Sequence, residues 1–103
     1  MCAVYLKLHE NDAGKSVIAA LCDKELLGKV YREKELVLDL ERYAAFYKGE
    51  ITGEEEAARA LKKAVSMNLV GRRSVGLALK LGLAGKGEVR KISGIPHLQI
   101  YRI

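Results

Sequence analysis

The sequence contains no tryptophan, one proline, one phenylalanine and two cysteines among its 103 residues. The two cysteines are not at the spacing of a metal motif and cannot form a disulfide framework, so we expect free thiols in a reducing compartment. No apolar run approaches the roughly 20 residues of a membrane-spanning helix, and residues 1–7 lack the pattern of a secretory signal. These absences predict a cytoplasmic protein without a membrane partner.

Asparagine and glutamine are scarce as well, with two and one residues, while lysine, glutamate and arginine are abundant. This bias is typical of thermophilic proteins. Half of the residues are hydrophobic, which is enough for one core in a chain of this length but not for two. We therefore predict a single domain that spans residues 1–103.

Acidic residues are almost absent from the second half of the chain. Residues 59–103 contain ten Lys or Arg and a single acid, Glu88, whereas residues 1–58 contain eight Lys or Arg and twelve acids. The two parts carry net charges of +9 and −4, which together give the +5 of the chain. Because so basic a segment attracts polyanions at long range, RNA is the first partner that the composition predicts.

Hydrophobic alternation and turn residues predict an α+β domain, a small mixed or antiparallel sheet with a helix pair packed on it. Turn-forming residues at 11–14 would join the first two strands in a hairpin, and the apolar run 16–22 is expected to be a central strand. Gly28 is expected to end a single turn that follows this strand. The predicted strands are residues 4–8, 16–22, 29–32, 36–40 and 97–103.

Two helices are predicted in the second half. Residues 52–55 (Thr-Gly-Glu-Glu) match a capping box, and winding residues 57–67 as a helix separates small and aliphatic side chains from cations. A second helix is predicted from about residue 72 to residue 81, with Gly82 as a Schellman stop. Residues 68–71 would then join the two helices in a tight corner.

The cations of these helices would form one basic surface if the helices met at such a corner, with free N–H groups at the second helix start for phosphate. The alternative is a set of ordinary solvated positions, in which Glu55 pairs with Arg59. Residues 59–87 hold seven cations and no acid, which favours a functional surface that binds RNA or docks an acidic protein. The predicted nucleic-acid contacts are Arg59, Lys62, Lys63, Asn68, Arg72 and Arg73.

Sequence-specific DNA binding by a helix-turn-helix is disfavoured, because residues 75–81 offer almost no polar side chain to base edges. RNA modules usually present exposed aromatic rings on which bases stack, and here Tyr101 beside Arg102 is the strongest candidate. A tyrosine with its ring packed and its hydroxyl in water explains that position equally well. The full set of aromatic candidates is Tyr5, Tyr31, Tyr43, Phe46, Tyr47 and Tyr101.

A thiol and an imidazole offer a different function. Cys22 and Asp23 end the central strand and His97 follows Pro96, so convergence would place a nucleophile beside a base. A metal site would use the same residues with His9. Neither arrangement has the spacing of a catalytic or metal motif, and a lone cysteine at the end of an apolar strand is most often a core residue. We expect no metal and no cofactor, and whether the chain is an enzyme stays open.

Five segments spread over nearly the whole chain carry a resemblance. They are residues 4–9 (Val-Tyr-Leu-Lys-Leu-His), 22–29 (Cys-Asp-Lys-Glu-Leu-Leu-Gly-Lys), 46–49 (Phe-Tyr-Lys-Gly), 66–71 (Ser-Met-Asn-Leu-Val-Gly) with Ser74-Val75, and 94–99 (Gly-Ile-Pro-His-Leu-Gln). In these segments the chain resembles a family of small archaeal proteins catalogued as domain of unknown function 424. The family more often has alanine at positions 67 and 98 and an acidic segment at 85–87, which makes the basic surface partly this protein's own.

The resemblance implies a small archaeal α+β protein, and at most RNA or translation-related work. It supplies no catalytic role and no oligomeric state. Backbone geometry explains the motif residues Gly28, Gly71 and Pro96. The polar motif residues are harder to explain in this way, and we expect several of them to meet around one pocket, which would make the chain a small enzyme or a ligand-binding protein instead. These residues are Cys22, Asp23, Asn68, His97 and Gln99.

Overall fold

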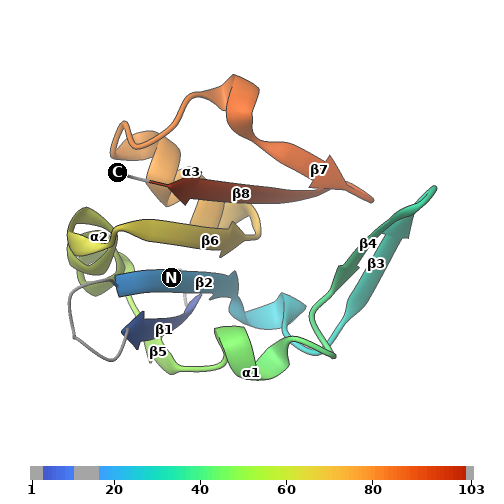
Figure 1. Ribbon diagram of the computed structural model, residues 1–103, viewed down its shortest axis with the longest axis horizontal. Helices are drawn as coiled ribbons and strands as arrows, with labels where there is room; N and C mark the ends of the chain where they lie inside the picture. Colours follow the sequence, from blue (N-terminus) through green and yellow to red (C-terminus); the bar gives the residue numbers. More distant parts are fainter. Residues whose placement is uncertain (1–3, 11–16, 102–103) are drawn as a thin grey trace.

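The computed structural model describes residues 4–10 and 17–101 of the chain (Figure 1). The strands are β1 Val4–Glu10, β2 Val17–Asp23, β3 Val30–Glu33, β4 Leu36–Asp39, β5 Glu50–Thr52, β6 Ser66–Val70, β7 Arg90–Ile92 and β8 Ile95–Tyr101. The helices are α1 Ala44–Tyr47, α2 Glu54–Lys63 and α3 Arg72–Lys80, with short 3-10 helices η1 Lys24–Leu26 and η2 Lys86–Glu88. Six strands form one sheet in the order β5-β1-β2-β6-β8-β7, and β3 and β4 form a separate ribbon. The predicted α+β class is confirmed.

Strands β1 and β2 form the antiparallel pair that the alternation predicts. They pair from Val4 opposite Asp23 to Glu10 opposite Val17. The turn predicted at residues 11–14 lies outside the described residues. Strand β2 has β1 on one side and, in parallel, β6 on the other, and it is buried from Ala19 to Asp23. Residues 17–22 of the apolar run therefore belong to a central strand, as predicted, and residue 16 lies outside the described residues.

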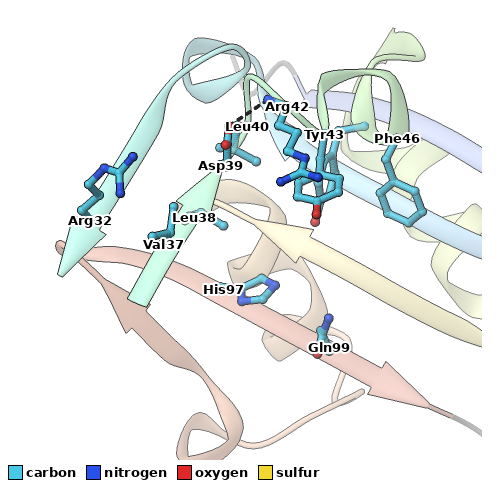
Figure 2. A pocket seen from close by; sticks show the side chains of 11 residues that line it. Arg32, Val37, Leu38, Asp39, Leu40, Arg42, Tyr43, Phe46, His97 and Gln99 are labelled. Atoms are coloured by element: carbon cyan, nitrogen blue, oxygen red, sulfur yellow. Dashed lines mark hydrogen bonds between the residues drawn. The ribbon is translucent and has the colours of Figure 1, made fainter. Parts of the chain in front are cut away.

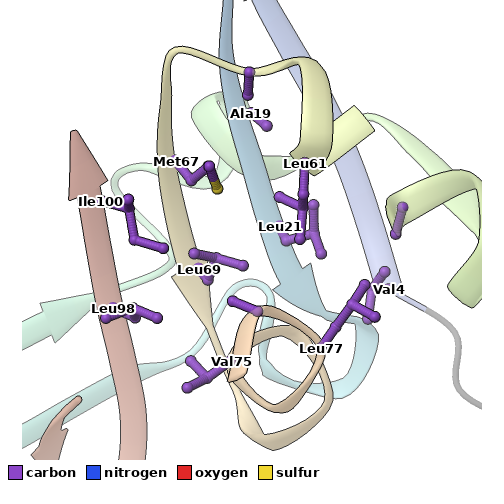
Figure 3. Close-up of a cluster of buried hydrophobic side chains, with 13 residues drawn as sticks. Val4, Ala19, Leu21, Leu61, Met67, Leu69, Val75, Leu77, Leu98 and Ile100 are labelled. Atoms are coloured by element: carbon purple, nitrogen blue, oxygen red, sulfur yellow. The ribbon is translucent and has the colours of Figure 1, made fainter. Parts of the chain in front are cut away.

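Helices α2 and α3 cover one face of the sheet (Figures 1 and 3). Alternate residues of each central strand point to them, such as Leu21, Leu69 and Leu98. Full burial of a leucine side chain contributes about 1.5–3 kcal/mol, so this layer is the main source of stability. Its buried members are Val4, Ala19, Leu21, Ala57, Leu61, Ala64, Met67, Leu69, Val75, Leu77, Ala78, Leu98 and Ile100.

The other face of the sheet is covered by α1, η1 and the β3–β4 ribbon. Helix α1 packs on β1 and β2, and the ribbon packs on β7, so the coverage is incomplete over β6 and β8. The hydrophobic cluster here is smaller than on the helix face. Its buried members are Ala20, Cys22, Leu26, Leu38, Leu40, Tyr47, Val70 and Ile92.

The helix predicted over residues 57–67 is too long. Helix α2 ends at Lys63, and residues 66–70 form β6 between β2 and β8. Ala64 and Met67 are buried in the core as predicted, but they reach it from a turn and from a strand. A short apolar run is compatible with the period of a helix and with that of a strand, and pairing with β2 and β8 selects the strand.

The predicted capping box at residues 52–55 is wrong. The N-cap of α2 is Gly53, which makes no side-chain cap hydrogen bond. Thr52 belongs to β5, opposite Val4, and its Oγ1 is buried without a hydrogen-bond partner. Pairing of β5 with β1 therefore holds the threonine one residue before the position from which it would cap the helix.

The predicted end of α3 is confirmed. Leu83 N–H donates to Ala78 O at 3.0 Å and Gly82 N–H donates to Leu79 O at 3.1 Å, the two bonds of a Schellman motif. Leu83 then packs against the core of the helix face. In the described part of the chain, no helix has the length and apolar character needed to cross a membrane.

Candidate functional site

The predicted basic surface depends on a tight corner between two helices, and that corner is wrong. Strand β6 separates α2 from α3, and Figure 1 shows α2 at the start of β6 and α3 following its arrowhead. A β-strand rises about 3.3 Å per residue, so the intervening strand β6 places Lys63 and Arg72 roughly 20 Å apart. The exposed cations Lys62 and Lys63 lie at the end of α2, whereas Arg72 and Arg73 lie at the start of α3, beside Glu54 and Ala57 of α2.

Carboxylates of the first half of the chain pair with several of these cations. Arg73 Nη1 lies 2.6 Å from Glu25 Oε1, and Arg59 Nη2 lies 3.8 Å from Glu55 Oε2. Hydrogen bonds from the backbone and from Arg73 hold the pKa of Glu25 below its ordinary value. Lys80 of α3 pairs with Glu54 of α2 at 2.7 Å. The positive charge of the helix face is therefore partly compensated.

Asp23 has a structural role. Its carboxylate accepts hydrogen bonds from Arg73 N–H at 3.0 Å, from Ser74 N–H at 2.9 Å and from Ser74 Oγ at 2.8 Å. It therefore caps α3 from the end of β2, fifty positions away. Gly71 has a φ of +106°, and a Cβ at that position would overlap the Asp23 carboxylate. Position 71 needs glycine for both reasons.

Cys22 is a core residue. Its side chain is fully buried and its Sγ donates to Asp23 O at 3.4 Å. Burial, with the Asp23 and Glu25 carboxylates adding to it, raises the pKa of the thiol to about 12. Val70 lies between Cys22 and His97 in register, so the two side chains are about two strand spacings, or roughly 10 Å, apart. They form no nucleophile and base pair, and the described residues contain no group of three potential metal ligands.

His97 and Gln99, in contrast, line a pocket of about 760 Å³ on the incompletely covered face. Figure 2 shows Tyr43 and Phe46 pointing from the α1 side toward β8, from which His97 and Gln99 point back. The β3–β4 ribbon closes a third side with Arg32. The full lining is Arg32, Val37, Leu38, Asp39, Leu40, Arg42, Tyr43, Phe46, Tyr47, His97 and Gln99.

Asn68 joins this group from the neighbouring strand. It lies opposite Gln99 in register, and Gln99 Nε2 donates to Asn68 Oδ1 at 2.9 Å. The structure thus brings together three of the five residues that we expected around one pocket, namely Asn68, His97 and Gln99. Cys22 lies in the core beneath this face, and Asp23 lies on the opposite face.

The imidazole of His97 is half-buried and lies opposite Arg90 of β7. Burial lowers the pKa of His97, and the Arg90 guanidinium lowers it further. The ring is therefore neutral at neutral pH, with one nitrogen that donates a hydrogen bond and one that accepts it.

Aromatic and cationic groups gather on the α1 side of the pocket. Tyr43 is 55% exposed, and the guanidinium carbon of Arg42 lies 5.6 Å from the centre of its ring. Asp39 Oδ1 accepts N–H bonds from Glu41 at 3.1 Å and Arg42 at 2.8 Å, which fixes the loop that carries both side chains. Phe46 stacks on His9 with ring centres 4.4 Å apart.

A second hollow of about 620 Å³ adjoins the first and shares His97 and Gln99 with it. It contains Arg90 and Tyr101, whose side chain is 74% exposed. We call the two hollows together the sheet-face cleft. The arginine, aromatic, imidazole and amide side chains that line it include Arg32, Arg42, Tyr43, Phe46, Arg90, His97, Gln99 and Tyr101.

Three arginines of the cleft, Arg32, Arg42 and Arg90, were not predicted from the sequence. Arg90 lies on β7, which pairs with β8 through a two-residue turn in which Ser93 and Gly94 both have positive φ. The Ser-Gly dipeptide at this point is a recognised hairpin signal and would have indicated the extra strand. Arg32 and Arg42 carry no such signal, because only the tertiary packing of the ribbon and α1 brings them to β8.

Comparisons with known proteins give a family and a fold without an activity. The family model described as protein of unknown function (DUF424) matches residues 10–103. A crystal structure of an uncharacterized conserved protein from Methanopyrus kandleri is similar, with 30% identity and a TM-score of 0.79 over 96% of this chain and 90% of that one. No curated protein matches the sequence.

Proposed function

This chain belongs to the family of proteins of unknown function DUF424, and we propose that it is a non-enzymatic cytoplasmic module that binds single-stranded RNA in the sheet-face cleft. The observation that carries the proposal is the convergence of exposed aromatic rings, arginines and amides on one open face of the sheet.

The aromatic rings and the arginines of the cleft each suit one part of an RNA strand. Exposed tyrosine rings provide stacking surfaces for unpaired bases, and each stacked base contributes about 1–3 kcal/mol. Arginines attract phosphates and also stack on bases. Two carboxylates, Asp39 and Glu88, also line the hollows. Each accepts a backbone N–H bond within its own loop: Asp39 from Arg42 at 2.8 Å, and Glu88 from Gly85 at 2.9 Å.

The helix face is less suited to the same task. Lys62 and Lys63 precede β6 and Arg72 and Arg73 follow it, and Glu25, Glu54 and Glu55 pair with cations of this face. Aromatic rings are absent from α2 and α3. We therefore assign the helix cations a contribution to long-range attraction only, while the cleft makes the contacts.

An enzymatic role has weaker support. The thiol of Cys22 is buried with a pKa raised to about 12, so it supplies no nucleophile at neutral pH. The cleft has a neutral imidazole at His97 but no second described residue placed to work with it as a catalytic pair. Binding is the function for which every group in the cleft has a use.

The test compares two sets of charge reversals of equal size. The cleft set is Arg32→Glu, Arg42→Glu and Arg90→Glu, and the helix set is Arg59→Glu, Lys62→Glu and Lys63→Glu. We expect the cleft set to weaken binding of a fluorescent single-stranded RNA by at least about a hundredfold at low salt, and the helix set by about tenfold or less. Circular dichroism checks that both variants are folded.

A salt titration of the same complex completes the test. Three phosphate contacts predict that the logarithm of the binding constant falls with the logarithm of salt concentration with a slope of about −2, and that the cleft variant loses most of this slope. Absence of binding at low salt, or an equal loss in both variants, would overturn the proposal. Capture of an acidic protein that persists after nuclease treatment, without RNA binding, would point to a protein adaptor instead.

A further inference from the structure

The amides of Asn68 and Gln99 form a pair on the open part of the sheet face. The two residues lie directly opposite each other on β6 and β8, and their side chains are joined by the 2.9 Å bond from Gln99 Nε2 to Asn68 Oδ1. Gln99 is exposed and Asn68 is half-buried, so the pair borders the cleft without being covered. The bond between them fixes both amides in one orientation.

This bond uses only part of the hydrogen-bonding capacity of the pair. Gln99 keeps its Oε1 acceptor and one N–H, and Asn68 keeps both N–H donors of its own amide. The pair therefore presents donors and acceptors side by side on a rigid strand surface. Phosphate contacts carry no information on base identity, whereas adjacent donors and acceptors match the edges of bases.

The neighbouring side chains of the cleft suit a base at this position. Tyr101 follows Gln99 by two residues on β8 and so lies on the same face, with 74% of its side chain exposed. Phe46 lies across the first hollow from Gln99 (Figure 2). A base stacked on one of these rings would turn an edge toward the amides. Unpaired RNA bases are commonly recognised by such a combination of stacking and edge hydrogen bonds.

We infer that the Asn68–Gln99 amide pair determines which base the cleft accepts, so that the protein discriminates among single-stranded RNA sequences. This inference rests on the proposed function and adds specificity to it. The arginines would set the strength of binding for every sequence, and the amide pair would set the differences between sequences.

The experiment measures dissociation constants for short oligonucleotides of adenylate, cytidylate and uridylate with the wild-type protein. One pair of edge hydrogen bonds discriminates between bases by about tenfold or more, so we expect at least that ratio between the tightest and the weakest oligonucleotide. The ratio is the informative quantity, because all three oligonucleotides carry the same phosphates.

Two variants alter the amide pair. Asn68→Asp keeps an acceptor for Gln99 Nε2 but removes the N–H donors at position 68, and Gln99→Ala removes the other amide. Either change should reduce the ratio to within about threefold, whatever it does to absolute affinity. Arg90→Gln is the control, and we expect it to weaken all three oligonucleotides by a similar factor and to leave the ratio unchanged.

The outcomes separate the inference from the proposed function. Binding of all three oligonucleotides with equal affinity overturns the inference and leaves the function standing. A ratio that survives in both amide variants assigns discrimination to stacking, and a ratio that disappears in Arg90→Gln assigns it to the arginine; either outcome also overturns the inference. If no oligonucleotide binds, both fail. Loss of the ratio in the amide variants alone supports both.

Discussion

The two faces of the six-stranded sheet differ in how they use the same strands. Among the described residues, thirteen apolar residues are buried on the helix face, counting those of α2 and α3, and eight on the opposite face, counting those of α1, η1 and the ribbon. On the second face, β8 presents His97, Gln99 and Tyr101 where the first face receives Leu98 and Ile100 from it. The comparison indicates that stability resides mainly on the helix face, and the binding that we propose uses the other face.

The largest expected effect is on the helix face, with the substitution Leu61→Ala. Leu61 is fully buried, so the loss of its side chain leaves a cavity and should lower the free energy of unfolding by about 3–4 kcal/mol. Leu36→Ala is the matched change on the ribbon, where the side chain is 54% exposed, and it should cost less than about 1 kcal/mol. Urea denaturation measures both. Equal losses would break the distinction between the faces.

Asp23→Ala should have the next largest effect. It leaves the N–H groups of Arg73 and Ser74 without their carboxylate acceptor, and we expect a loss of about 2–3 kcal/mol in the free energy of unfolding. RNA affinity, measured at a temperature where the variant is folded, should be unchanged, because the cap lies on the helix face. A large fall in affinity with little loss of stability would contradict the structural role of Asp23.

Tyr43→Ala should show the reverse behaviour. The ring is 55% exposed, so its removal should cost little stability. We expect RNA affinity to fall by about tenfold, the effect of losing one stacking surface. Tyr43→Phe keeps the ring and should retain most of the affinity. An unchanged affinity in Tyr43→Ala would remove this ring from the proposed binding surface.

The smallest effect concerns pH. The folded state holds the pKa of His97 below its ordinary value of about 6.5, first because the ring is half-buried and then because Arg90 lies beside it. The other charged and titratable groups that line the pocket with His97 are Arg32, Arg42, Asp39, Tyr43 and Tyr47. The unfolded chain therefore takes up a proton at higher pH than the folded chain, and the free energy of unfolding should decrease as the pH falls from about 7 through the ordinary pKa of histidine.

The variant His97→Gln tests this pH dependence, because the free energy of unfolding should then fall less steeply as the pH decreases from about 7 through the ordinary pKa of histidine. Because bound phosphate favours the protonated imidazole, RNA binding should strengthen slightly over the same pH range in the wild type. A slope that His97→Gln leaves unaltered would assign the titration to other groups.

Local sequence signals were sufficient for much of the fold. The apolar run of β2, the alternation of β8 and the stop at Gly82 depend on neighbours within a few residues, and each was predicted correctly. The end of α2 was not, because Ala64 to Met67 satisfies a helical and an extended pattern alike. Only pairing with β2 and β8 selects the strand, and pairing is not visible locally.

The site was less accessible to prediction. His97, Gln99 and Asn68 were expected to meet because their residue types have no backbone role, and they do. Asp23 was grouped with them, but it accepts a hydrogen bond from a residue fifty positions later at the start of α3, a contact that spacing does not encode. Arg32 and Arg42 come from the ribbon and from the loop before α1, which only tertiary packing brings to β8, whereas Arg90 lies on β7, the hairpin neighbour of β8.

Strand β8 has a consequence for the thermodynamics of any ligand. A shift of one residue in its register would expose Leu98 and Ile100 and bury the polar side chains, so this wall cannot slide without the loss of the core. It is therefore preorganised, and the entropy lost on association falls on the ligand and on exposed side chains such as Arg42. The affinity of a ligand for the cleft therefore also reports whether β8 keeps its native register.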